Sequence, residues 1–254
     1  MQSRQTPKWL SLFITAFGAK GLVALAWWMG ALHAERIRGL QRSYPFLGIT
    51  ANCHSSQFLL LRTLFNLLGR DRCEPIGTAD SAKALIQVNN ASNWPVVLDH
   101  HSGTFDWDAL RPCYNGDGAG FCPRAIEPTK FRGALLVLGQ PPMSDALRSR
   151  FVFVELDHLQ HTEESAQALQ DLLDMHGTGG FDFYDTVEAA GERLEGLLQH
   201  TTAYFVQPHD NKRAAFNHAQ LHALLGVLDD LFVLPTDARE DAHIEVAAMT
   251  LITD

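Results

Sequence analysis

The sequence predicts an α/β protein with a mainly parallel sheet in a three-layer core, preceded by a helical lead-in and followed by a helical tail. Short apolar runs typical of buried parallel strands alternate with helical segments over residues 44–160. Over residues 1–43 and 161–254 the strand pattern is absent and apolar residues recur at helical spacing. With 46% hydrophobic and 19% charged residues, the 254-residue chain can bury a substantial core. We therefore expect three parts, with boundaries near residues 43 and 160.

The lead-in, residues 1–43, is predicted to hold one or two helices. Apolar residues at positions 10, 13, 14 and 17 share one helical face, and a longer helix follows over residues 22–40. The uncharged run over residues 21–32 is too short for a membrane span, which needs roughly twenty apolar residues. No small-residue cleavage site follows it, so it is not a signal peptide. We expect a buried core helix, no membrane contact and a cytoplasmic location.

The core is predicted to alternate strands with helices. The stretch WPVVLDHH places an acid after a four-residue apolar run, which is typical of a buried parallel strand. Gly69 is suited to end a helix, because glycine readily adopts the left-handed conformation. Strands are predicted over residues 44–49, 94–101, 132–139 and 150–157. Helices are predicted over residues 55–68, 78–88 and 105–114.

The tail is predicted to consist of amphipathic helices over residues 163–175, 181–199 and 218–232. The first two are separated by the glycine-rich hinge GTGG. The spacing of the leucines suits helices that pack one face on the core. We expect the tail to cover one side of the sheet, as a lid or an oligomer contact.

The segment over residues 44–70 has the frame of a phosphate-binding loop: a strand, a stretch of small or polar residues, then a long helix. Such a loop uses glycines so that backbone N–H groups reach the phosphates, a lysine to bind the terminal phosphates, and a hydroxyl to hold Mg²⁺. The pattern G-x-x-x-x-G-K-[ST] falls on Ala51, Asn52, Cys53, His54, Ser55, Ser56, Gln57 and Phe58.

Every diagnostic position of that pattern differs. Ala51 and Ser56 replace the glycines, which adds Cβ atoms where the backbone must approach phosphate. Gln57 replaces the lysine and Phe58 replaces the Mg²⁺ ligand. Taken alone, this segment does not qualify as a nucleotide-binding motif.

Several phrases, in order, resemble a group of phage and bacterial primase–helicase-type P-loop ATPases that are often attached to TOPRIM primase modules. The resemblance covers roughly residues 6–175 and fades in the tail. These phrases are TPKWLSLFITAFGAKGLVALAWWMGALHAERIR, YPFLGIT, LLRTLFNLLGR, NWPVVLDHH, FDWDALRPCYNG, FRGALLVLGQ and ALRSRFVFVELD. The resemblance implies a P-loop NTPase fold of the RecA/AAA+ type, with ATP and Mg²⁺ as cofactors.

The resemblance also implies roles for single residues. Asp99 stands at the second ATPase motif, where a carboxylate holds Mg²⁺, and His100 replaces the family's glutamate. Gln140 stands where a polar residue senses the γ-phosphate. Arg148 or Arg150 stands where an arginine finger reaches a neighbouring subunit's nucleotide.

Each of these positions also has a plainer explanation. Asp99 and His100 suit a strand-end surface pair, Gln140 a loop residue, and Arg148 and Arg150 solvated arginines. We do not expect a histidine metal site at positions 100 and 101, because neighbours on a strand point to opposite faces. The four cysteines form no C-x-x-C pair, which favours free thiols in a reducing cytosol.

The net charge of −9 excludes a global basic field that would attract nucleic acid. Contact with single-stranded DNA would need a local element, such as a pore loop at residues 116–124, in a ring of like or unlike subunits. The first hypothesis is therefore an ATPase-fold protein of phage or mobile-element DNA replication with impaired hydrolysis. The second is a non-catalytic interaction or regulatory protein that keeps the scaffold. An unrelated enzyme using Asp99, His100 and His101 is the weakest hypothesis, because no nucleophile or metal set accompanies these residues.

Overall fold

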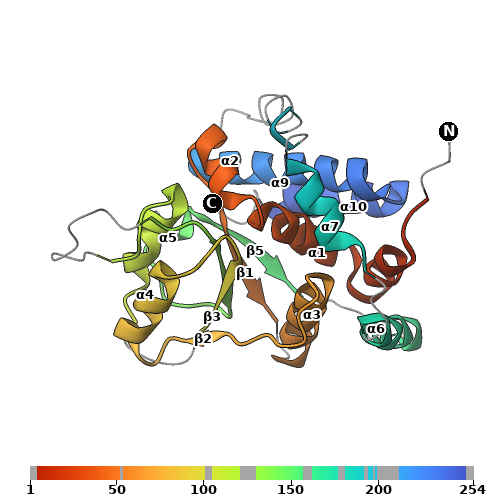
Figure 1. Cartoon of the computed structure of the whole chain (residues 1–254), viewed down its shortest axis with the longest axis horizontal. Coiled ribbons are helices and arrows are strands. Elements are labelled where there is room, and N and C mark those ends of the chain that lie inside the picture. The colour runs from red at the N-terminus through yellow and green to blue at the C-terminus, as the bar shows by residue number, and fades with distance from the viewer. Residues whose placement is uncertain are drawn as a thin grey trace.

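Five parallel strands form the centre of the fold (Figure 1). The computed structural model describes residues 5–51, 54–100, 105–120, 130–156, 162–176, 181–191, 194–196, 198 and 212–249. The strands are β1 (Phe46–Thr50), β2 (Ile76–Gly77), β3 (Pro95–Asp99), β4 (Ala134–Leu138) and β5 (Phe151–Glu155), in the order β2-β3-β4-β1-β5. The predicted α/β fold with a parallel sheet is confirmed. The two-residue strand β2 was not predicted.

The path of the chain explains why the sheet has helices on both faces. From β1 the chain crosses to β2 at one edge, then returns through β3 and β4 and passes over β1 to β5. Parallel crossovers are right-handed, so the outward and the returning connections lie on opposite faces. Helix α3 (His54–Leu67) therefore covers one face. The returning connections, α4 (Ser81–Asn89), η1 (Trp107–Asn115) and α5 (Asp145–Arg148), cover the other.

Two hydrophobic clusters follow from this layering. Alternate residues of a strand point to opposite faces, and in β1 Leu47 and Ile49 belong to the larger cluster while Phe46 belongs to the smaller one. The larger cluster also contains α3 and helices from both ends of the chain. Helices of the lead-in and tail are needed there because the crossovers place only α3 on that face.

The lead-in forms α1 (Lys8–Ala31) and α2 (Ala34–Gln41). Helix α1 bends at Gly18, whose φ of 61° lies outside the helical region. On length and composition alone α1 is apolar enough to cross a membrane, and it is the one such helix in the described part of the chain. Its second half is buried against the core, α9 and α10, which agrees with the predicted core helix. That run includes Trp27 and Trp28, both fully buried.

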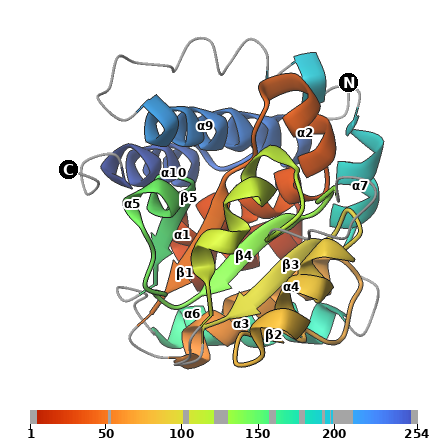
Figure 2. The same cartoon turned by 90° about the vertical axis from the view of Figure 1, so that its left-hand side faces the viewer.

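The tail is helical where it is described, with α6 (Glu163–His176), α7 (Phe183–Ala189), α9 (Lys212–Phe232) and α10 (Thr236–Met249). Figure 2 shows α9 and α10 side by side, along the same side of the sheet as α1. Helix α9 begins earlier than predicted, and α10 was not predicted. The helix predicted over residues 181–199 is interrupted rather than continuous. Helix α7 ends at Ala189, residue 190 is a turn, and residues 191, 194–196 and 198 are helical again. The division into three domains stays a prediction.

The helices that connect the strands differ in type or in starting residue from those predicted over residues 105–114 and 78–88. Residues 107–115 form a 3₁₀ helix rather than an α-helix, and Pro112 within it lacks the N–H that an α-helix would use. The cap of α4 is Asp80, whose side chain accepts a hydrogen bond from the Lys83 amide at 3.0 Å. Gly69 has a φ of 70°, as expected for the residue that ends α3.

Candidate functional site

Some of the predicted site residues lie at one edge of the sheet, namely the start of α3, Asp99 with His100, and Gln140. Arg150 lies at the opposite edge, where its carbonyl accepts from the Phe46 amide at the start of β1. Because all five strands are parallel, Thr50 at the end of β1 and Asp99 at the end of β3 lie on the same carboxyl edge, with β4 between them. Ligands of open α/β sheets bind at this edge. Asp99 thus lies at the end of a parallel strand on the edge from which the α3 connection leaves, as predicted.

The connection from β1 to α3 is shorter than a phosphate loop. Helix α3 begins at His54, so residues 51–53 alone separate it from β1. Asn52 and Cys53 lie outside the described residues, and Ala51 is half-buried. The predicted loop residues Ser55 and Ser56 are already helical. This edge therefore offers the N-terminus of a helix in place of a long glycine-rich cradle.

Gln57, at the lysine position, is turned inward. Its side-chain Nε2 donates a hydrogen bond to the Ile49 carbonyl at 3.2 Å, and the residue is 3% exposed. The same carbonyl accepts a bond from the Gly139 amide at 2.9 Å. Gln57 therefore ties α3 to the ends of β1 and β4. It is neutral, and its amide is directed at the sheet instead of the open edge.

Phe58, at the Mg²⁺-ligand position, points away from the sheet, and its side chain is 45% exposed. It lines a groove on α3 with Arg62 and Arg72. Arg62, a cation one turn further along α3, is exposed. Ser56, at the second glycine position, is buried.

Asp99 and His100, the residues at the second ATPase motif, contact the neighbouring strand β4 and the helix η1. The Asp99 carbonyl accepts a bond from the Thr78 hydroxyl at 3.1 Å, and the His100 amide donates to the Leu138 carbonyl at 3.2 Å. The His100 ring contacts Trp107 edge-on, with 5.5 Å between centroids. Among the described residues, no group accepts from or donates to its buried Nδ1. Asp99 itself is half-buried.

Beyond β4 the chain turns sharply at Gly139, whose φ is +88°. A Cβ atom there would lie 3.5 Å from the His100 Cβ, so the left-handed backbone is what makes glycine necessary. The turn leaves Gln140 exposed.

The two candidate finger residues differ in their surroundings. The Arg150 guanidinium lies over the Tyr114 ring, 5.6 Å from its centroid, and Nη1 donates to the Ala146 carbonyl. Burial, and then the nearby Arg213, lower the pKa of Arg150. Arg148 is exposed and lies over Phe153 at 5.7 Å. Arg150 is engaged within the fold, whereas Arg148 is presented at the surface.

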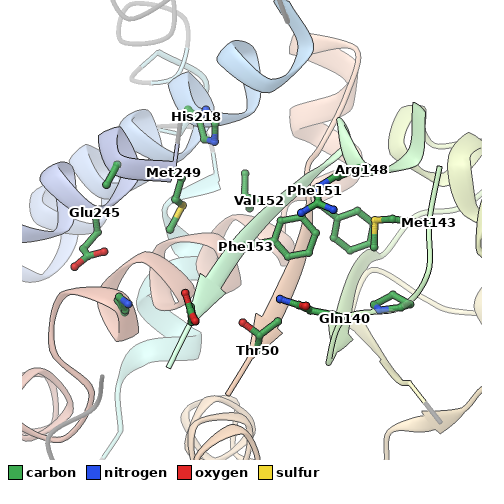
Figure 3. Close-up of a pocket in the computed structure, with 14 residues that line it drawn as sticks. Thr50, Gln140, Met143, Arg148, Phe151, Val152, Phe153, His218, Glu245 and Met249 are labelled. Carbon is green, nitrogen blue, oxygen red and sulfur yellow. The ribbon is translucent and has the colours of Figure 1, made fainter. Parts of the chain in front are cut away.

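A cavity of about 290 Å³ lies along β5 (Figure 3). It brings together two of the predicted site positions, Gln140 and Arg148, with Thr50 at the end of β1. Figure 3 shows Phe151, Phe153 and Met143 near Arg148, and Glu245 and Met249 across the strand. The sequence did not indicate the α10 residues, because α10 itself was not predicted.

The described residues do not fit Mg²⁺·ATP. Mg²⁺ that is bound with a nucleotide takes one or two protein ligands, and at this edge Asp99 offers a carboxylate while position 58 offers no hydroxyl. Among the described residues no group of three or more histidine, cysteine, aspartate or glutamate side chains could hold a metal ion on its own. Burial raises the pKa of both Cys73 and Cys113 to about 12, so these thiols are protonated and poor metal ligands. At the loop itself, neither Gln57 nor Phe58 can supply a cation or a hydroxyl.

A parallel sheet of this order, with a helix leaving the carboxyl end of β1, has the α/β fold of P-loop NTPases. Among solved structures, the chain is similar to an active helicase, SCCmec type IV Cch, with a TM-score of 0.69 and 13% sequence identity. That match covers 96% of this chain and 50% of the helicase, so the chain spans half of its length.

Two further structures are less similar. The apo C-terminal region of NrS-1 has a TM-score of 0.42, with 10% identity over 96% of this chain and 71% of its own. JCV helicase has a TM-score of 0.38, with 10% identity over 91% of this chain and 65% of its own. No protein-family profile and no curated protein matches the sequence.

Proposed function

We propose that this protein is a helicase-like ATPase-fold protein of phage or mobile-element DNA replication, related to primase–helicases, with ATP hydrolysis impaired or lost. Its fold is shared with a solved helicase, which supports the first part of the proposal. The Gln57 amide supports the second, because it is bonded to the Ile49 carbonyl where a lysine would reach phosphate.

Impaired hydrolysis follows from several independent losses at one edge. A charge-assisted hydrogen bond contributes roughly 1.5–3 kcal/mol to binding, and the missing lysine matters more once charge builds up in the transition state. The short connection before His54 removes backbone donors, and the exposed Phe58 removes a metal ligand. In this proposal the chain works within an assembly, where Arg148 acts on a neighbouring subunit's nucleotide and single-stranded DNA is bound by the assembled ring.

The second candidate is a non-catalytic regulatory or interaction protein that binds neither nucleotide nor DNA. The net charge of −9 favours it. Fluorescence anisotropy with labelled single-stranded DNA separates the two candidates, measured on the chain alone and with candidate ring partners. Binding that weakens steeply with salt supports the first candidate. No binding under any of these conditions supports the second.

The nucleotide part is tested by restoring the motif. The variant Ala51→Gly/Ser56→Gly/Gln57→Lys/Phe58→Ser is titrated with a fluorescent ATP analogue, with and without Mg²⁺. We expect measurable, Mg²⁺-dependent binding where the natural chain shows weak binding that Mg²⁺ does not change. A matched variant carries Gln57→Met in place of Gln57→Lys, which keeps the length of the side chain without its charge. If that variant binds equally well, the lysine position is not what limits binding.

A further inference from the structure

We propose that the open edge of β5 binds an extended peptide segment of a partner protein, which adds to the sheet as a sixth strand. The segment would carry an acidic residue near Arg148, a basic residue near Glu155 and Glu245, and small or β-branched residues between them. This inference does not depend on nucleotide binding, and it commits to a peptide as the ligand.

The backbone of β5 has unused hydrogen-bonding groups on its outer side. β5 is the edge strand and pairs only with β1 among the described strands. The Phe46 amide donates to the Arg150 carbonyl at 2.9 Å, and the Leu156 amide donates to the Thr50 carbonyl at 2.8 Å. In a parallel ladder alternate residues face the same neighbour, so the groups of residues 151, 153 and 155 point outward. Within the described chain, those of Phe151 and Phe153 have no backbone partner.

An exposed strand edge is normally covered or charged, because it pairs readily with other chains. Here the edge is bordered by a cavity of about 290 Å³. Val152 lines that cavity together with Phe151 and Phe153, which project from the opposite face of the strand. A cavity lined from both faces of one strand must lie along its edge. The unpaired groups are therefore reachable only by a chain that enters this cavity.

The walls of the cavity suit the alternating side chains of a strand. On one side stand α10, with Met249, and α9, with His218. On the other stand Met143 and the Phe153 ring. The Phe153 ring covers Gly48, and a Cβ atom at Gly48 would lie 2.4 Å from Cδ1 of that ring. Strand addition uses this combination, in which main-chain bonds give affinity and side-chain pockets give specificity.

Charges at the two ends of the cavity favour one kind of peptide. Arg148, with its guanidinium 5.7 Å from the Phe153 ring centroid, lies near the start of β5 (Figure 3). Glu155 at the end of β5 and Glu245 on α10 supply two carboxylates, accompanied by Lys20. The net charge of the cavity lining is therefore positive near the start of β5 and negative near its end. A segment with an acid and a base at its opposite ends complements it.

A second copy of this chain fits the edge less well. Its β5 would arrive with its own α5 and α10 beside it, and the α5 and α10 of the first copy already stand at this cavity. A lone extended segment brings no such helices. Self-association through β5 is therefore a separate outcome of the test.

The probes are two fluorescein-labelled peptides, KTVTVE and its reverse EVTVTK, which cover antiparallel and parallel addition. Fluorescence anisotropy with the full chain should show saturable binding of one of them. The matched control is the same peptide with alternate amides N-methylated, which removes the main-chain donors and keeps the side chains. We expect at least tenfold weaker binding of the methylated peptide, because two or more hydrogen bonds are lost. Hydrogen exchange should show new protection of the Phe153 amide when the unmodified peptide is bound.

A variant on α10 tests the charge complementarity. Glu245→Lys should weaken binding of the lysine-ended peptide and favour a peptide whose lysine is changed to glutamate. Ile244→Lys, at a residue that is 64% exposed on the same helix, should change neither affinity. The proposal is overturned if neither probe binds at millimolar concentration, or if N-methylation leaves the affinity unchanged. It is also overturned if the chain alone forms a dimer that protects the Phe153 amide.

Discussion

Gln57 stabilises the contact between α3 and the sheet, and at the same position it supplies no cation for phosphate. It is buried, and its amide bonds to the carbonyl that also receives the Gly139 amide. Gln57→Ala should lower the free energy of unfolding by about 1–3 kcal/mol, because it removes a buried hydrogen bond and leaves the Ile49 carbonyl with one donor fewer. Urea denaturation measures the change. Arg62→Ala, exposed on the same helix, should stay within about 0.5 kcal/mol of the natural chain.

Arg38 is a buried cation that is held by backbone oxygens and lies over the Phe131 ring, 5.2 Å from its centroid. It is 6% exposed, and its guanidinium donates to the carbonyls of residues 114, 131, 132 and 133 over 2.7–3.4 Å. Burial lowers its pKa to about 10, so it is charged at neutral pH. It therefore joins α2 to the end of η1 and to the chain that enters β4.

Removing that cation should be strongly destabilising. Arg38→Met should reduce the free energy of unfolding by about 2–4 kcal/mol, because several buried carbonyls lose a charged donor at once. Arg36→Met is the matched control on the same helix. Its exposed ion pair with Glu195, at 2.8 Å, should contribute less than about 1 kcal/mol. Equal losses in the two variants would mean that the carbonyl contacts of Arg38 contribute little.

At the scale of elements, helices α9 and α10 are joined by a pair of histidines. The Nδ1 atoms of His222 and His243 lie 2.7 Å apart and share a hydrogen bond, and the rings are stacked. Burial, with the nearby His243 and His218 adding to it, lowers the pKa of His222 to about 4. The pKa of His243 is lowered by burial and by Arg239, while Asp229 opposes this.

This pair predicts acid sensitivity of the tail. Between pH 6.5 and 4 the unfolded chain binds a proton at position 222 that the folded chain does not, so stability should fall as the pH falls through this window. We expect a loss of about 1–2 kcal/mol, since partial exposure of both rings reduces the effect. Thermal melts from pH 7 to 4 measure it. In His222→Gln most of the dependence of the melting temperature on pH should disappear. An unchanged dependence would assign the effect to other titratable groups.

The sequence predicted four of the five strands, because each of those four contains a short apolar run bounded by turn residues, whereas β2 is two residues long. It also placed Asp99 after one apolar strand and residues 51–58 after another, and a parallel sheet brings the ends of both strands to one edge. The orientation of Gln57 could not be predicted, because it depends on the Ile49 carbonyl and the packing of α3. Helix α10 was missed because much of its surface is exposed and its apolar pattern is weak, with only Ala242 and Val246 buried.

At the scale of the whole molecule, the lead-in and the tail complete a core that the sheet alone leaves open. The crossover order puts only α3 on one face, and α1, α6, α9 and α10 fill the rest. Helices of the lead-in and of the tail are therefore part of the main hydrophobic cluster. They also wall the cavity beside β5, so the tail shapes a binding surface as well as the core.

The loss of ATP hydrolysis is tested most directly by turnover of the purified chain. Steady-state phosphate release should be no faster for the natural chain than for Asp99→Ala, in the presence or absence of Mg²⁺, because the lysine and hydroxyl positions hold Gln57 and Phe58. Circular dichroism must first show that both proteins are folded. Turnover by the natural chain that Asp99→Ala abolishes would contradict the proposal, and would mean that another cation, such as Arg62 or Lys130, replaces the missing lysine.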